Sequence, residues 1–190
     1  SVSLGDSNES SDLWSFDLRR GVPTRFTSDP SIERALVWSP DGTQTIFNAR
    51  RADSADGVRL LALYEKAANG VGAESLVLAE DSNLWPESWS PDGRYLLYSR
   101  VSSRSAELKV LPLAGERKPP YRLFDTNART DRAQFSPDGR WIAYSSSEAG
   151  GSEVFVTSFP TPGRRVRVSL GGGSWPQWRR DGKELYYLAS

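Results

Sequence analysis

The sequence of 190 residues contains no histidine, no cysteine and no methionine. Without histidine the chain lacks the usual general base near neutral pH and the commonest metal ligand, so it cannot build a Ser-His-Asp triad. Without cysteine it has no disulfide, no thiolate zinc site and no cysteine nucleophile. The missing methionine, including an initiator, indicates a fragment of a longer polypeptide. We therefore expect a chain that is not itself an enzyme and carries no cofactor.

Net charge and long apolar runs are also lacking. Lysine plus arginine equals aspartate plus glutamate at 24 each, so no overall field draws the chain to nucleic acid or to an anionic membrane. No segment approaches the roughly 18 consecutive apolar residues of a membrane span. Residues 1–12 are serine-rich and acidic, unlike a signal sequence. With 37% hydrophobic residues, we expect a soluble globular chain without nucleic-acid or direct membrane contact.

What the sequence does contain is a repeated four-residue word that follows an aromatic residue. Three copies read Ser-Pro-Asp-Gly and a fourth is decayed to Arg-Arg-Asp-Gly. The copies lie about 40 to 50 residues apart, the period of a four-stranded propeller blade. With their aromatics they are Trp38-Ser39-Pro40-Asp41-Gly42, Trp89-Ser90-Pro91-Asp92-Gly93, Phe135-Ser136-Pro137-Asp138-Gly139 and Trp178-Arg179-Arg180-Asp181-Gly182.

Each word has the chemistry of a tight turn between antiparallel strands. Proline presets φ, aspartate bonds a nearby backbone amide, and glycine takes the left-handed conformation that closes a hairpin. We therefore interpret the aspartates and glycines of all four words as structural turn residues. A second column of aromatics stands nine residues after the first: Phe47, Tyr98, Tyr144 and Tyr187.

Short apolar segments after the turns, such as 95–98 and 141–144, are typical of strands buried between packed sheets. A second strand pair follows each hairpin, for example 107–113 with 121–124 and 153–159 with 164–169. The sequence thus predicts an all-β fold, a β-propeller of four-stranded antiparallel blades in a single region, 1–190. We divide that region into an outer half-blade (1–30), three blades (31–80, 81–128 and 129–171) and an inner half-blade (172–190).

These parts add up to about four blade equivalents, near the lower end of the range of about four to eight in propellers. Two arrangements follow: the half-blades join to close a small ring, or the chain is an open arc of a larger propeller. We favour the arc. Its open blade edges would favour self-association with another copy.

The repeat resembles that of TolB-like, WD-repeat-like propellers, over essentially the whole length. Three segments are more narrowly similar to the C-terminal propeller of bacterial eukaryotic-like serine/threonine protein kinases. They are Asp12-Leu13-Trp14, the run from Gln134 to Trp141 and the run from Gly171 to Leu185. The resemblance implies an extracytoplasmic or periplasmic sensor or protein-binding module, with the kinase domain outside this chain.

Two other functions stay open. The same word occurs in propellers that gate substrate for prolyl-oligopeptidase-like serine peptidases, whose catalytic domain is also outside this chain. A propeller can also act as a lactonase or lyase, but such an enzyme needs metal ligands that the sequence does not supply.

Other charged groups have simpler interpretations. The repeated aspartates stand one per blade, too far apart for paired carboxylates, which need separations of about 5 to 9.5 Å. Asp53 and Asp56 lack the oxygen-donor alternation of a calcium loop and indicate a solvated loop. The arginines of residues 164–167 and 179–180 lie beside acids, so they do not indicate a nucleic-acid site.

The candidate binding residues stand three or four positions before the first aromatic of each repeat. There a propeller chain opens onto the mouth of the central channel, and this column varies among blades while the aromatic columns do not. Two tryptophans offer flat apolar faces and three residues offer charge, a mix that suits a protein, peptide or glycan ligand. The tryptophans could instead pack beneath the next turn. The residues are Arg34, Trp85, Asp131, Arg132 and Trp175.

Overall fold

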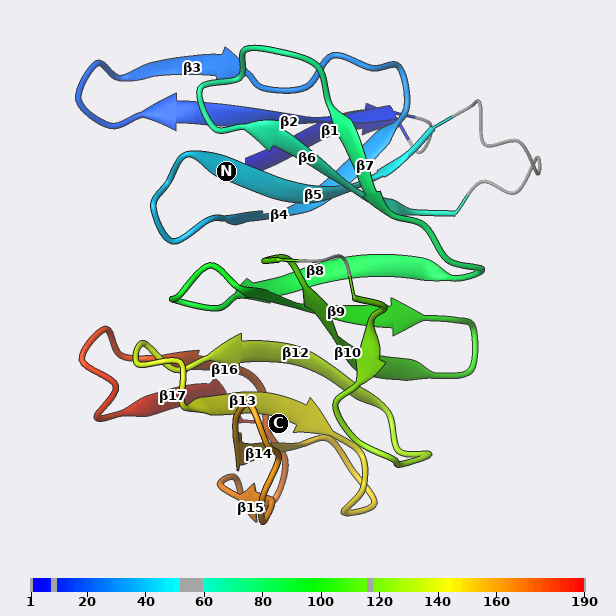
Figure 1. Ribbon diagram of the computed structural model, residues 1–190, viewed down its shortest axis with the longest axis vertical. Helices are drawn as coiled ribbons and strands as arrows, with labels where there is room; N and C mark the ends of the chain where they lie inside the picture. The colour runs from blue at the N-terminus through cyan, green and yellow to red at the C-terminus, as the bar shows by residue number, and fades with distance from the viewer. Residues whose placement is uncertain (1, 8–9, 52–59, 116–117, 190) are drawn as a thin grey trace. The chain divides into compact units, whose positions relative to one another are not determined.

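The computed structural model describes residues 2–7, 10–51, 60–115 and 118–189. Within these ranges every regular element is a β-strand, drawn in chain order in Figure 1. Accordingly, the described residues contain no helix that could cross a membrane. The chain divides into two compact units, a first unit of residues 1–86 and a second unit of residues 87–190. The all-β fold is confirmed.

The first unit holds one whole blade and the strands that precede it. In the blade, the antiparallel order is β4 (Ile32–Trp38), β5 (Gln44–Arg50), β6 (Ala62–Ala67) and β7 (Ser75–Leu78). Before it come β1 (Val2–Ser7), β2 (Ser10–Asp17) and β3 (Val22–Arg25), and both β1 and β3 pair with β2. The sequence indicated only two strands here, because β1 is polar and lacks an alternating apolar pattern.

Phe47 lies at the centre of the first unit's core. It is fully buried on β5, the strand paired on both sides, by β4 and β6. Its ring packs edge-on against Phe26, with centroids 6.4 Å apart, and stacks on Tyr64 at 6.3 Å. Leu13 and Ala49 complete the buried cluster. Phe47 of the second aromatic column is therefore a core residue of the first unit.

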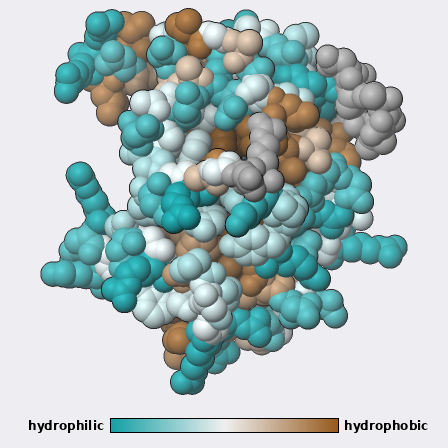
Figure 2. Space-filling model, viewed as in Figure 1, coloured by the Kyte–Doolittle hydropathy of each residue, from teal (hydrophilic) through white to brown (hydrophobic). Residues whose placement is uncertain are grey.

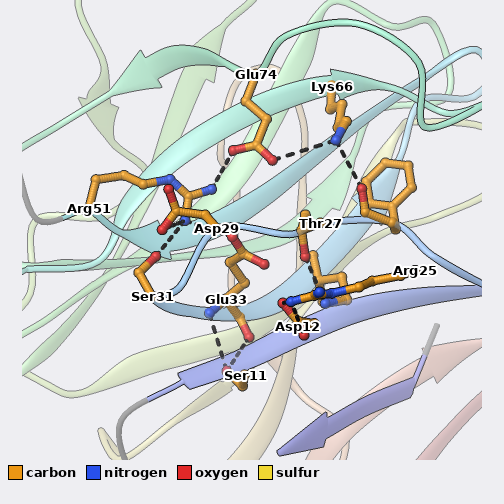
Figure 3. Close-up of polar contacts among 12 residues, drawn as sticks. Ser11, Asp12, Arg25, Thr27, Asp29, Ser31, Glu33, Arg51, Lys66 and Glu74 are labelled. Atoms are coloured by element: carbon orange, nitrogen blue, oxygen red, sulfur yellow. Dashed lines mark hydrogen bonds and ion pairs between the residues drawn. The ribbon is translucent and has the colours of Figure 1, made fainter.

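An ion-pair network fastens the segment before β4 to the blade (Figure 3). The Arg51 guanidinium lies 2.6 Å from Oε1 of the fully buried Glu33 and also pairs with the carboxylate of Glu74. Lys66 lies 3.6 Å from Glu74 and donates to the backbone carbonyl of Phe26 at 2.9 Å. Removing one partner of a buried pair typically costs about 3 to 5 kcal/mol, because the other charge is left uncompensated. The network is therefore a structural fastening of the first unit.

The remaining strands form three sheets. One has the order β11-β10-β9-β8, and a second runs from β12 to β15. The last is the pair β16 and β17. Their bounds are β8 (Asn83–Trp89), β9 (Tyr95–Val101), β10 (Ala106–Pro112), β11 (Tyr121–Arg122), β12 (Thr130–Phe135), β13 (Trp141–Ser146), β14 (Glu153–Ser158), β15 (Val166–Arg167), β16 (Ser174–Trp178) and β17 (Leu185–Leu188). Four-stranded antiparallel blades are thus confirmed, although the outermost strands β11 and β15 are shorter than predicted.

The second unit is held by an aromatic core between its sheets. Tyr144 is fully buried and lies 4.6 Å from Phe124 and 5.9 Å from Phe155, measured between ring centroids. Phe135 packs edge-on against Phe159 at 5.0 Å. Both aromatic columns of the repeat therefore contribute to this core.

The turn words close their hairpins by the same set of hydrogen bonds. In the third copy the Ser136 hydroxyl donates to Asp138 Oδ1 at 2.5 Å and accepts the Trp141 N–H at 3.0 Å. Asp138 also accepts the Arg140 N–H at 3.0 Å, and both bonds lower the pKa of this carboxyl. Gly139 has a φ of 70°, in the left-handed region that glycine enters without strain.

The other copies repeat or adapt this arrangement. The hydroxyls of Ser39 and Ser90 donate to the aspartate of their own word at 2.6 Å. In the decayed copy the Arg179 guanidinium replaces the hydroxyl, donating to Asp181 at 2.6 and 2.8 Å. A charged side chain thus keeps the turn where serine has been lost.

A second repeated contact lies at the connection into each new blade. The Thr27 hydroxyl accepts the Leu13 N–H at 2.9 Å, and the Thr130 hydroxyl accepts the Leu108 N–H at 3.0 Å. Ser169 accepts the Val154 N–H at 2.8 Å in the same way. All three hydroxyl residues are buried, so each bond satisfies a backbone donor that water cannot reach. This column is not visible as a repeat in the sequence, because the intervals between its members vary with loop length.

On the face shown in Figure 2, hydrophilic side chains cover most of the surface and apolar residues show between them. Exposed large apolar side chains include Leu18, Leu170 and Leu188. Exposed apolar residues of this kind are normal in soluble proteins and do not by themselves identify a site.

Replacing a turn serine should destabilise the chain more than replacing an ordinary serine. Ser136→Ala removes a donor to Asp138 and leaves the Trp141 N–H without its acceptor, so we expect a loss of about 1 to 3 kcal/mol in the free energy of unfolding. Urea denaturation measures this loss, and Ser103→Ala, at an exposed bend, is the matched control. Equal stability of the two variants would show that the hydroxyl is dispensable.

Candidate functional site

The first strand of three blades carries a β-bulge just before the turn word. The register of β4 against β5 shifts between Arg34 and Leu36. On β12 the shift lies between Asp131 and Gln134, and on β16 it lies between Ser174 and Gln177. A bulge bends a strand and re-aims a side chain, and bulges are frequent beside functional sites. The predicted binding residues Arg34, Asp131, Arg132 and Trp175 therefore lie at the irregular part of their strands.

Two of these bulges hold a non-glycine residue in the left-handed region. Arg132 has a φ of 55° and Trp175 a φ of 56°, and they are the two described non-glycine residues with positive φ. Each stands three positions before the aromatic of its word, so the positions are equivalent in successive blades. For a residue with a Cβ this conformation costs about 1 to 2 kcal/mol. The folded chain therefore bears this energetic cost at two equivalent positions, Arg132 and Trp175.

The two strained residues meet. The Arg132 guanidinium carbon lies 3.8 Å from the centroid of the Trp175 ring, a close cation–π contact. Arg132 is half-buried, whereas 47% of Trp175 is exposed. The bulges thus aim an arginine and a tryptophan from adjacent blades into one surface pair.

Glu87 lies beneath this pair on β8. Its Oε1 accepts the Ser99 hydroxyl hydrogen at 2.6 Å and the Arg132 backbone N–H at 3.2 Å. Burial raises the pKa of Glu87 to about 7, and the charge of Asp131 adds to that effect, while the hydrogen bonds from Ser99 and the Arg132 backbone and the positive charge of Arg132 oppose it. A carboxyl that titrates near neutral pH therefore supports the backbone of the bulge.

The other predicted binding residues are placed differently. Asp131 is half-buried and pairs with its neighbour Arg129, whose Nη2 lies 2.8 Å from Asp131 Oδ2. Arg34 is exposed on β4 and Trp85 is half-buried on β8, both in the first unit. The structure therefore brings together Arg132 and Trp175 in the second unit, with Asp131 next to Arg132 in the chain, whereas Arg34 and Trp85 belong to the first unit.

Sequence reasoning missed Glu87 and Ser99. One signal for Glu87 is present, because the equivalent position two residues before the word's aromatic is apolar elsewhere, as Leu36, Ala133 and Pro176. A carboxyl at a repeat position that is otherwise apolar indicates that the residue has a role specific to its own blade. Ser99 gives no such signal, because Asn48 and Ser145 are polar at the same place.

Hydrogen bonds account for the carboxylates of the turn words. Asp41 accepts the Ser39 hydroxyl and the Thr43 N–H, and Asp181 accepts the Lys183 N–H. Asp53 and Asp56 lie outside the described residues. Among the described residues, no group of three or more acidic, histidine or cysteine side chains is placed to hold a metal ion.

No family model and no curated protein matches the sequence. Solved structures match the fold. TolB from Acinetobacter baumannii superposes with a TM-score of 0.75 at 20% identity, over 93% of this chain and 42% of its own. A putative TolB from Agrobacterium tumefaciens gives 0.64 at 18% identity, over 97% of this chain and 79% of its own. The chain has a TolB-like β-propeller fold.

The TolB-like chain spans less than half the length of the Acinetobacter baumannii protein. A similar fold occurs in a structure of a nidogen/laminin complex, with a TM-score of 0.67 at 11% identity over 94% of this chain and 66% of the other. At these identities the likeness shows the fold alone.

The strain at Arg132 can be measured by substitution in the TolB-like chain. Arg132→Gly and Arg132→Ala both remove the cation–π contact, but only glycine also relieves the left-handed backbone. We expect the glycine variant to be more stable by about 1 kcal/mol in chemical denaturation.

The control for that comparison is Arg167, which is exposed on strand β15 and is not among the positive-φ residues. There alanine should be the more stable replacement, because glycine is unfavourable inside a strand. The same order of stability at both positions would contradict backbone strain at Arg132.

Glu87 makes stability depend on pH. The unfolded chain ionises this carboxyl near pH 4.5, whereas the folded chain holds the proton until about pH 7. The free energy of unfolding therefore falls as pH rises between these values, by about 2 to 3 kcal/mol from Glu87 alone. Glu87→Gln cannot ionise and should remove that part of the decline.

Urea unfolding at about pH 5 and about pH 8 measures this difference. Glu184→Gln, at an exposed carboxyl near the last turn, is the control and should keep the wild-type decline. A Glu87→Gln variant with the wild-type decline would show that Glu87 titrates in its ordinary range.

Proposed function

We propose that this chain is a non-catalytic binding propeller, the sensor or protein-interaction part of a larger bacterial protein. The observation that carries the proposal is the contact of Arg132 with Trp175 from equivalent left-handed bulges. Strain at a surface position persists when the surroundings enforce it, and such positions cluster at binding sites. Neither side chain is needed to close a hairpin or fill the core, which supports a role in recognition.

The chemistry of the pair supports a protein or peptide ligand. Tryptophan and arginine are the residue types most enriched where binding energy concentrates in protein interfaces. A half-exposed tryptophan offers a large apolar face at a small entropic cost, and a partly buried guanidinium offers several fixed donors. The mouth of the propeller channel is the site we propose for this ligand.

The parent protein that we propose is a serine/threonine kinase with this propeller outside the cytoplasm. The basis is the resemblance of the segment from Gly171 to Leu185, which contains Trp175, to propellers appended to such kinases. A peptidase that gates its substrate is the other setting. The coding sequence that flanks this region distinguishes them, because a kinase domain would lie upstream and a hydrolase domain downstream.

Selection from a displayed peptide library tests the binding function. Purified chain should enrich peptides that bind it at least about tenfold more tightly than they bind the double variant Arg132→Gly, Trp175→Gly, since loss of central contacts costs about 1.4 kcal/mol or more. Glycine is chosen because it fits the left-handed backbone, so the variant keeps its fold. A library in which no peptide prefers the wild-type chain over this variant would overturn the proposal.

A further inference from the structure

We infer that Arg132 and Trp175 form a receptor for a carboxylate carried by a peptide, and that Glu87 controls its affinity. The carboxylate would be an aspartate or glutamate side chain or a C-terminus. This inference rests on the proposed function, because it names the ligand chemistry of the same site.

The first support is that the Arg132 guanidinium forms no ion pair among the described residues. Asp131 pairs with Arg129, and Glu87 bonds to Ser99 and to the backbone N–H of Arg132. The charge of Arg132 acts on Glu87 through space and lowers the pKa of that carboxyl. While Glu87 keeps its proton, no ionised carboxylate of a described residue is paired with the Arg132 guanidinium.

The second support is the geometry of the stack. The Arg132 guanidinium carbon lies 3.8 Å from the centroid of the Trp175 ring. The five N–H donors of a guanidinium lie in one plane and point away from its edges. Those edges match the two oxygens of a carboxylate, which arginine binds through parallel hydrogen bonds. The left-handed backbone and the contact with Trp175 restrict the Arg132 side chain, so this side chain loses less rotamer entropy when it binds a carboxylate.

The third support favours a peptide over an acidic sugar. Trp175 lies on β16, which pairs only with β17 among the described strands. Its second edge therefore carries backbone donors and acceptors that no described strand pairs. An extended peptide can bond to such an edge while its side chain reaches Arg132, whereas a sugar chain cannot continue the ladder.

Glu87 is placed to modulate the charge at this receptor. The groups that act on it are Ser99 on β9, and Asp131 and both the backbone N–H and the charge of Arg132 on β12. Ser99 carries no charge, and Asp131 is paired with Arg129. Ionised Glu87 would therefore offset the charge of Arg132 and repel an incoming carboxylate, and neutral Glu87 would not. Acidic ligands should bind more tightly as pH falls through the range near 7, because ligand binding and proton binding are coupled.

The experiment titrates the intact chain, labelled with ¹⁵N at arginine and tryptophan, with hexaglutamate and with hexaglutamine, both amidated at the C-terminus. Hexaglutamate should shift the Arg132 Nε and Trp175 indole signals, and hexaglutamine should not. Arg132→Gln should weaken hexaglutamate binding at least about tenfold, as expected for loss of a charged hydrogen-bond pair. Arg167→Gln, at an exposed arginine on β15, should bind like the wild type.

Measurement of hexaglutamate binding at different pH values distinguishes a specific site from general attraction of a polyanion. Hexaglutamate stays ionised between about pH 6 and about pH 8. Its affinity should therefore rise by about three- to tenfold as the pH falls through this range, and this rise should come from protonation of Glu87. The variant Glu87→Gln should lose that dependence. Equal pH dependence in both proteins would overturn the control by Glu87.

The remaining outcomes distinguish the two levels of the proposal. If selected peptides prefer the wild-type chain but carry no acid, the binding function stands and the carboxylate receptor is wrong. If oligogalacturonate shifts the two signals and hexaglutamate does not, the ligand is an acidic glycan and the peptide assignment is wrong. If neither the selected peptides nor hexaglutamate bind the chain through Arg132 and Trp175, both proposals fail.

Discussion

The serine hydroxyl of the turn word is the contact on which the rest of this fold depends. It donates to the aspartate of its word and accepts the first N–H of the returning strand, as Ser136 does with Asp138 and Trp141. One small side chain therefore fixes both the turn and the pairing next to it. Where serine is lost, Arg179 forms a charged substitute with the same aspartate position. The aspartate and the glycine stay while both the serine and the proline are replaced, so the fourth turn keeps its carboxylate with a different donor.

The geometry of the turn sets the register in which the first strand of the blade pairs with the second. Phe135 pairs with Ile142 beside one turn, and Trp178 pairs with Leu185 beside the last. Because both hairpins start in the same register, the bulge that follows falls at the same place in each strand. Arg132 and Trp175 are therefore superimposable positions of one repeat. Their contact needs no special loop, since two successive blades with the same bulge bring the two side chains to adjacent strands.

The sequence alone predicted the all-β blades because the information is local. A proline, an aspartate and a glycine in fixed order determine a turn, and the aromatics Phe47, Tyr98 and Tyr144 have no other place than the core. It also identified Arg132 and Trp175 as candidates, since they vary within a constant repeat. It could not predict their contact, because a bulge with positive φ is normally marked by glycine and here is not. Glu87 was missed for a related reason: its partners are a backbone N–H and a serine from another strand.

The cost of the left-handed bulges bears on how a repeat acquires a function. Glycine at Arg132 and Trp175 would keep the bulge without strain, so the fold itself gives no reason for these side chains. Half-buried Glu87 is a second departure in the same place, because an apolar residue stands at the equivalent position in the other repeats. The left-handed backbones of Arg132 and Trp175 and the carboxyl of Glu87 are three energetically unfavourable features at one surface pair. Independent packing effects do not readily explain all three. These features are the observations on which we propose that this part of the scaffold gives up stability for a specific arrangement of charge that recognises an anionic group.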